Sequence, residues 1–266
     1  MMILEQLHEY AKQLEKLLRL RTFPFAVKML NSEQDVPREA KRPVKDLGYH
    51  LDVCQGFAMS RREGATIAMM KEDMWCFEPV VGYGLAEPPK YFLDGHNRYP
   101  ASAMTLEAGG KWARSFPRLR VGEYIGIVST PLGALTFVPD LFVVYCDPSQ
   151  LTQLLRAKIC IDGGDITNTL SGHAACVYAI VPLIQDKQNQ QCQVVSPCRG
   201  DRIYAMAKEE EIIFSAQIEM LGHFITALQY LQKQGSGFPD KLTYQPEHEL
   251  IMSYEKIGEM LGMKFR

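Results

Sequence analysis

The sequence has no excess of either charge and no apolar run long enough to cross a membrane. Its 266 residues carry 29 Lys and Arg against 31 Asp and Glu, a formal net charge of −2. Such a chain lacks the basic stripe that non-specific nucleic-acid binding requires. The longest apolar candidate, residues 121–146, is interrupted by Glu123, Pro131 and Asp140 and so falls short of the ~20 residues of a membrane span. We therefore expect neither a nucleic-acid partner nor a membrane partner.

The first residues lack the apolar core of a secretory signal peptide, because Glu5, His8 and Glu9 interrupt it. We therefore expect a cytoplasmic protein. The 20 glycines and 15 prolines are scattered and aromatic residues reach 10%, which excludes collagen-like and disordered classes. A chain of this length that is 47% hydrophobic can bury its own core, and we predict a single domain over residues 1–266.

The common catalytic motifs are missing as well. The sequence contains no G-x-G-x-x-G after a strand, no P-loop, no G-x-S-x-G and no H-E-x-x-H. It also contains no C-x-x-C, so the usual spacings of zinc ribbons, thioredoxins and ferredoxins are absent. No reaction follows from these motifs, and whether the protein is an enzyme stays open.

Seven cysteines are present, and an odd number without a secretion signal argues against a disulfide framework. Cys146 ends an apolar run and Cys160 follows a helical pattern, so we expect both to be buried. Cys192 lies in a glutamine-rich segment, and we expect it to be exposed. The other four lie beside glycine or proline, where an open backbone lets N–H groups point at sulfur. These four are Cys54, Cys76, Cys176 and Cys198.

The four turn-associated cysteines form two pairs with equal spacing. Cys54 and Cys76 are 22 residues apart, and so are Cys176 and Cys198. Each pair follows an apolar segment that starts with a proline. The pattern favours an internal duplication, with halves at about residues 21–136 and 137–216, although equal spacing can also arise by chance. In a duplicated fold, a pseudo-two-fold axis would bring two cysteines from each half together.

Hydrophobic periodicity predicts a mixture of helices and strands. Apolar positions recur at helical spacing over residues 3–20, and similar patterns follow at 148–160, 171–180, 217–233 and 247–261. Strands are predicted at 25–30, 66–70, 124–129, 141–146, 193–196, 203–207 and 211–216. We therefore predict an α+β (or α/β) fold: two pseudo-symmetric mixed α/β halves with an N-terminal helix and C-terminal helices over 217–266.

Five segments together resemble a known family. They are Thr22-Phe-Pro-Phe-Ala-Val-Lys, Cys54-Gln, Lys71-Glu-Asp-Met-Trp-Cys76, Gly172-His-Ala-Ala-Cys176 and Pro197-Cys198-Arg-Gly-Asp-Arg202. The sequence resembles the prokaryotic domain-of-unknown-function family number 169, from about residue 5 to residue 240. The resemblance implies that Cys54, Cys76, Cys176 and Cys198 are the family's cysteines, and it implies no reaction. Phe77-Glu78 departs from the pattern, which favours a proline directly after Cys76.

The resulting hypothesis is a 4Fe–4S cluster held by Cys54, Cys76, Cys176 and Cys198, because four thiolates are the complement of a cubane cluster. Such a cluster is anionic, so we expect Arg202 and Lys71 to contribute to binding it. Complete thiolate ligation favours electron transfer, with cluster-dependent chemistry as a variant. A four-cysteine zinc protein stays open, and so does a cluster-free module with buried thiols that binds a small anion through Lys28 and Arg202. A redox partner protein and a homodimer also stay open.

Overall fold

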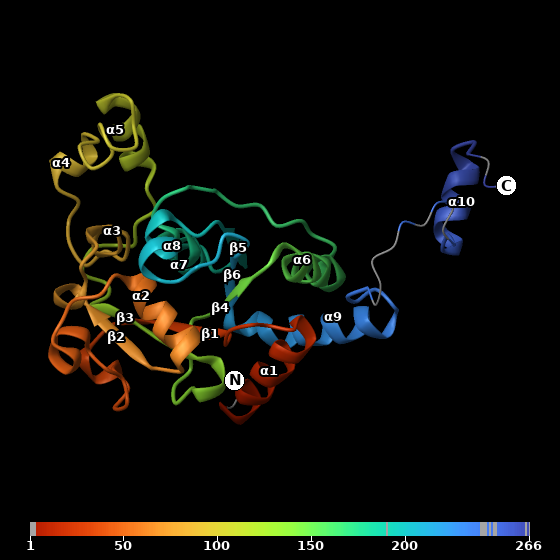
Figure 1. Ribbon diagram of the computed structural model, residues 1–266, viewed down its shortest axis with the longest axis horizontal. Helices are drawn as coiled ribbons and strands as arrows, with labels where there is room; N and C mark the ends of the chain where they lie inside the picture. The colour runs from red at the N-terminus through yellow and green to blue at the C-terminus, as the bar shows by residue number, and fades with distance from the viewer. Residues whose placement is uncertain are drawn as a thin grey trace.

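A six-stranded antiparallel sheet organises the chain (Figure 1). The computed structural model describes residues 4–189, 191–239, 244, 246, 249–263 and 265. The strands are β1 (Phe25–Leu30), β2 (Ile67–Met70), β3 (Gly126–Pro131), β4 (Leu141–Cys146), β5 (Cys192–Val195) and β6 (Ile212–Gln217). The helices are α1 (Leu4–Leu18), α2 (Val53–Ala58), α3 (Phe77–Gly82), α4 (Lys90–Leu93), α5 (Leu106–Ser115), α6 (Pro148–Asp162), α7 (Ala175–Gln185), α8 (Arg199–Tyr204), α9 (Leu221–Lys233) and α10 (Met252–Met260).

The strand order is symmetric about the centre of the sheet. It reads β2-β3-β1-β4-β6-β5, so exchanging β1 with β4, β2 with β5 and β3 with β6 gives the same order read from the opposite edge. The outer pairings match too, because Phe25 at the start of β1 faces Pro131 at the end of β3, and Leu141 at the start of β4 faces Gln217 at the end of β6. The mixed α/β fold of two pseudo-symmetric halves is therefore confirmed, with the two-fold relation passing between β1 and β4.

Both faces of the sheet are covered, which explains why most strand residues are buried. Side chains alternate between the faces along each strand. Odd-numbered residues of β1 and β4, such as Phe25 and Val143, pack in one cluster with residues of α2, α3 and α7. The even-numbered Phe142 packs on the other face among residues of α1, α6 and α9, where its ring lies 6.0 Å from that of Phe224. Cys176 and Cys198 pack in the first of these clusters, and Cys54 lies in a small separate cluster with Ala58 and Ala205.

The predicted N-terminal and C-terminal helices are present within the described residues. The apolar face of α1 buries Leu7, Ala11, Leu14 and Leu18 completely. The helices α9 and α10 follow the last strand. Ile3 and residues 247–248, which the predicted helices included, lie outside the described residues. No helix among the described residues is both long and apolar enough to span a bilayer.

Three local predictions are wrong. Residues 203–207 are not a strand, because the Asp201 carboxylate accepts the Cys198 N–H at 3.1 Å and starts the helix α8 there. Cys160 is exposed, because it lies on the outer side of α6. Cys192 is buried, because it begins β5 and packs into the cluster beneath α6 and α9. The glutamines around Cys192 make this segment polar, so its sequence did not indicate that Cys192 begins a short edge strand.

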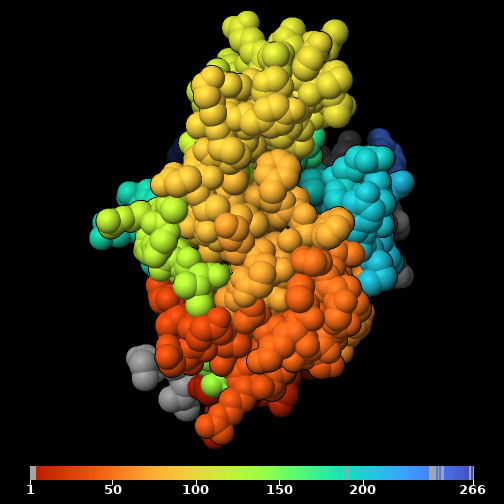
Figure 2. Space-filling view, turned by 90° about the vertical axis from the view of Figure 1, so that its left-hand side faces the viewer, coloured from red at the N-terminus to blue at the C-terminus, as the bar shows by residue number. Residues whose placement is uncertain are grey.

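One segment has no counterpart in the other half. Between α3 and β3, residues 83–125 contain α4 and α5, whereas a short connection joins α8 to β6. Figure 2 shows this segment, in yellow, projecting from the top of the molecule. An aromatic cluster holds it together, with the Phe92 ring 6.1 Å from that of Trp112 and 5.8 Å from that of Phe116. We call residues 83–125 the insertion.

Candidate four-cysteine site

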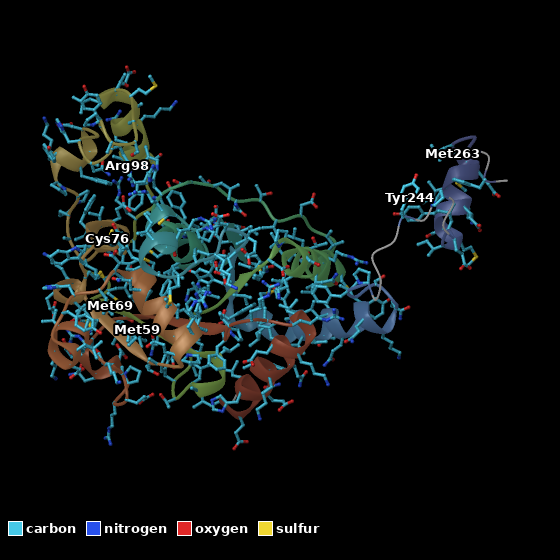
Figure 3. All side chains as sticks on the ribbon, viewed as in Figure 1. Met59, Met69, Cys76, Arg98, Tyr244 and Met263 are labelled. Atoms are coloured by element: carbon cyan, nitrogen blue, oxygen red, sulfur yellow. The ribbon has the colours of Figure 1, made fainter. Side chains whose placement is uncertain are left out.

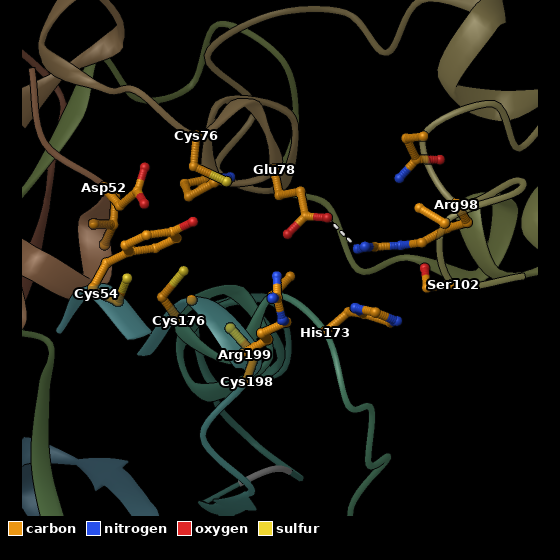
Figure 4. Close-up of a pocket in the computed structure, with 17 residues that line it drawn as sticks. Asp52, Cys54, Cys76, Glu78, Arg98, Ser102, His173, Cys176, Cys198 and Arg199 are labelled. Carbon is orange, nitrogen blue, oxygen red and sulfur yellow. Dashed lines mark hydrogen bonds and ion pairs between the residues drawn. The ribbon is translucent and has the colours of Figure 1, made fainter. Parts of the chain in front are cut away.

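Four cysteines line a single cavity of about 400 Å³. They come from four separate elements: α2, the residue before α3, α7 and the residue before α8. Figure 4 shows Cys76 on one side of the space and Cys54, Cys176 and Cys198 across from it. The structure thus brings together Cys54, Cys76, Cys176 and Cys198, the four that the sequence singled out.

Their positions repeat between the two halves. Cys54 is the second residue of α2, and Cys176 is the second residue of α7. Cys76 and Cys198 each occupy the N-cap position, directly before the first residue of α3 and α8. The helices α2 and α7 precede the equivalent strands β2 and β5, and α3 and α8 follow them. The cavity therefore lies where the two halves meet.

Backbone N–H groups point at two of the sulfurs. The Cys76 sulfur accepts from the N–H of Glu78, and the Cys198 sulfur accepts from the N–H groups of Ala175 and Asp201. Gly200 keeps the same area open, since an added Cβ there would lie 3.6 Å from the Cys198 Sγ and 4.0 Å from the Cys54 Sγ. Backbone N–H groups that donate to sulfur stabilise thiolates.

Burial keeps these thiols neutral while no cation is bound. Cys54 and Cys176 are each 7% exposed, and burial raises the pKa of both well above the usual thiol value. Burial, with Glu78 nearby, raises the pKa of Cys76 to about 12. Burial, with Asp201 nearby, raises the pKa of Cys198 to about 11. Ionising the four thiols therefore requires a positive centre among them.

A buried polar network anchors the Cys198 turn. Asp201 is fully buried, and its carboxylate accepts hydrogen bonds from the Tyr145 hydroxyl at 2.9 Å and from the Cys198 N–H at 3.1 Å. The Arg61 guanidinium lies 4.0 Å above the Tyr145 ring and pairs with Glu211 at 2.9 Å. Arg61 belongs to the turn Met59–Glu63 that continues α2. The network thus connects the turn that follows the Cys54 helix α2 with the turn that carries Cys198.

The far end of the cavity is polar and borders the insertion. Glu78 forms an ion pair with Arg98, whose guanidinium lies 4.0 Å from the centre of the Trp112 ring. His173 packs edge-on against the same ring at 5.8 Å, and burial lowers the pKa of its imidazole. Burial also raises the pKa of Glu78, although Arg98 opposes this effect. Figure 3 shows Arg98, a residue of the insertion, above Cys76.

Other predicted binding residues lie away from this cavity. Lys71 is exposed at the start of the turn Lys71–Asp73, and Arg202 donates a hydrogen bond to the Lys208 carbonyl oxygen. Lys28 lies on β1, with its Nζ 3.9 Å from Asp35. None of these three lines the cavity, whereas Arg199 does. A cofactor role for Arg202 and Lys71 stays a prediction.

The comparisons with known proteins identify a family without a known activity. The model of family DUF169, described as "Uncharacterised ArCR, COG2043", matches residues 13–227. "Uncharacterized protein MJ0308" of Methanocaldococcus jannaschii is 24% identical over 235 residues, which cover 87% of this chain and 97% of that protein. No solved structure matches the chain.

Proposed function

The chain belongs to the DUF169 family, and from that premise we propose that Cys54, Cys76, Cys176 and Cys198 together hold one 4Fe–4S cluster. The observation that carries the proposal is the convergence of the four thiols, at equivalent positions of two halves, on one cavity. Four thiolates are the usual protein ligands of a cubane cluster. Cys146, Cys160 and Cys192 do not line this cavity.

A 4Fe–4S cluster and a single zinc ion need thiolates at different spacings. Zinc with Zn–S bonds of 2.3 Å holds its thiolates about 3.8 Å apart in a tetrahedron. Among the described residues, no three Cys, His, Asp or Glu side chains are grouped tightly enough for one metal ion. A cluster places iron and sulfide between its thiolates, so it requires them farther apart. The four sulfurs face a common cavity of about 400 Å³, and that room suits the larger group.

The donors around the sulfurs suit an anionic group. The N–H groups of Glu78, Ala175 and Asp201 already point at sulfur, and the exposed Arg199 supplies a positive charge at the cavity. Donors and cations of this kind lower the energy of a thiolate-bound cluster and raise its reduction potential.

We assign the cluster a redox role. A bound 4Fe–4S cluster accepts and releases one electron. A protein with two buried apolar layers does not need a metal to fold, as a much smaller domain does. We therefore propose electron exchange with a redox partner protein, and cluster-dependent chemistry is the alternative. We propose a cytoplasmic location, which the reduced state of the cysteines supports, because a reducing compartment keeps thiols out of disulfides.

Metal and sulfide analysis after anaerobic purification tests the proposal. We expect iron and acid-labile sulfide in equal amounts, about four of each per chain. The variants Cys54→Ser and Cys198→Ser should lose most of both. Two controls should keep both: Cys192→Ser, which changes a buried thiol on the other face of the sheet, and Cys160→Ser, which changes an exposed one. Stoichiometric zinc without sulfide, or the same loss in the control variants, would overturn the proposal.

A further inference from the structure

The cavity extends beyond the cysteines into a region that the binding of a cluster does not require. Asn97, Arg98, Ala101 and Ser102 of the insertion line this part, opposite His173 and Arg199. The second half of the fold has no segment equivalent to the insertion. This end of the cavity is therefore not pseudo-symmetric. A cluster held by two equivalent cysteine pairs does not require such a difference between the halves.

Buried polar atoms without partners gather around this cavity. The described part of the chain has six buried side-chain nitrogen or oxygen atoms without a hydrogen bond, and four of them belong to residues that line it. They are the Arg98 Nε, both the Nδ2 and Oδ1 of Asn97, and the Asp52 Oδ1. Buried polar groups are nearly always hydrogen-bonded, so such a concentration marks a place where water or a polar ligand binds.

The Arg98 guanidinium is already held in position. One of its terminal nitrogens pairs with Glu78, and its face lies against the Trp112 ring at 4.0 Å. These contacts leave Nε as the donor without a partner. A fixed donor of this kind loses little conformational freedom when it binds a ligand.

The free groups define the chemistry of the ligand. The Arg98 Nε, the Asn97 Nδ2 and the exposed Arg199 are donors that match a carboxylate. The Asn97 Oδ1 is an acceptor and matches a hydroxyl group. Ala101 and Ala174 add apolar surface for a short carbon chain. A cavity of about 400 Å³ is at the small end for ligand sites, and a cluster would fill part of it.

We propose that the Asn97–Arg98 end of the cavity binds a small hydroxycarboxylate next to the four cysteines. The small size of the ligand is the part of this inference that rests on the proposed function, because the cluster would occupy the other end of the cavity. The contacts to carboxylate and hydroxyl do not depend on iron. Arg199 attracts the carboxylate at the cavity, and Asn97 distinguishes a hydroxylated acid from a plain one.

Three probes of matched size test the proposal: lactate, propionate, which lacks the hydroxyl, and propane-1,2-diol, which lacks the carboxylate. Isothermal titration calorimetry on the full chain, as purified anaerobically and after iron removal, should show binding of lactate. Propionate should bind about tenfold more weakly or worse, because the Asn97 Oδ1 stays unpaired. The diol should give no measurable heat. Equal binding of all three probes, or binding of none, would overturn the proposal.

Two variants locate the site. Asn97→Ala should weaken lactate binding about tenfold or more. Arg199 is exposed, so Arg199→Ala should leave the fold intact and weaken the binding of both lactate and propionate. The matched control is Asn31→Ala, since Asn31 is exposed and its side-chain amide donates a hydrogen bond to the Glu123 carbonyl oxygen, away from the cavity. Unchanged binding by both site variants, or an equal loss in the control, would contradict the assignment.

Iron analysis of the same samples separates this inference from the proposed function. A chain that contains no iron when purified anaerobically and still binds lactate would support the ligand site and refute the cluster. A chain that contains the cluster but does not bind lactate would support the cluster and refute the ligand site.

Discussion

The contact between α3 and α7 sets how far apart Cys76 and Cys176 lie, and Gly82 permits it. A Cβ at Gly82 would lie 2.5 Å and 2.8 Å from the two γ-methyl carbons of Val177, too close for any real contact. Val177 directly follows Cys176 and is fully buried, so it has no free space to turn into. Cys76 caps the other end of the same short helix α3. The variant Gly82→Ala therefore tests whether this close approach is needed.

The magnitude follows from overpacking. Adding a methyl group to a filled contact costs about 1–3 kcal/mol, so we expect Gly82→Ala to lower the free energy of unfolding by about 2 kcal/mol. Val177→Ala removes two buried methyl groups and should cost about 2 kcal/mol by itself. In the double variant the new methyl group fills the space left by valine. Its cost should therefore be about 2 kcal/mol instead of the sum, about 4 kcal/mol.

Urea unfolding of the iron-free chain measures these energies. The control is Gly133→Ala, where the added Cβ meets only the Ala11 Cβ at 3.8 Å and the stability should be unchanged or higher by up to about 1 kcal/mol. The iron content of Gly82→Ala should also fall, because α3 and α7 are forced apart. If Gly82→Ala is as stable as the wild type, or if the two substitutions are simply additive, the reasoning about this contact is refuted.

Three further predictions concern pH, the buried network and charge. The raised pKa values of Cys76 and Cys198, about 12 and about 11, favour the thiol form in the folded state, so the iron-free chain should be most stable below about pH 8.5 and lose stability as the pH rises toward 11–12. Thermal unfolding between pH 7 and pH 11 checks this, and a Cys76→Ser/Cys198→Ser variant with the same pH slope would contradict it. Tyr145→Phe leaves one oxygen of the buried Asp201 carboxylate without its donor and should cost about 1–3 kcal/mol in urea unfolding, whereas Tyr254→Phe, at an exposed position, should cost nothing measurable. In cluster-loaded protein, Arg199→Ala should lower the reduction potential more than Arg202→Ala, because only Arg199 lines the cavity; potentiometric titration giving the opposite order would refute this.

The cysteine pattern could be read from the sequence because it follows the chain. Equal spacing of the two pairs reflects equal strand-and-helix order in the two halves, so Cys54 and Cys176 fall at the same helix position, and so do Cys76 and Cys198. The equivalent strands β1 and β4 can likewise be recognised in the sequence, because each is an apolar run. Local periodicity carries this information directly.

The polar half of the site could not be read in this way. Asn97 and Arg98 lie in a turn-rich stretch without hydrophobic periodicity, and nothing in the spacing indicates that they face the cysteines. The ion pair between Arg61 and Glu211 joins residues 150 positions apart, which only the folded sheet brings together. Arg202 was favoured because it is close in sequence to Cys198. In the helix α8 its side chain points to Lys208 instead, and Arg199 lines the cavity.

The central claim is that four cysteines share one cluster, and native mass spectrometry under anaerobic conditions tests it most directly. We predict a single adduct of about 350 Da on the wild-type chain, the mass of four irons and four sulfides. The adduct should be absent from a variant in which Cys54, Cys76, Cys176 and Cys198 are all serine, and present on Cys192→Ser. An adduct of about 65 Da, the mass of one zinc ion, or an unchanged adduct on the four-serine variant would contradict the account.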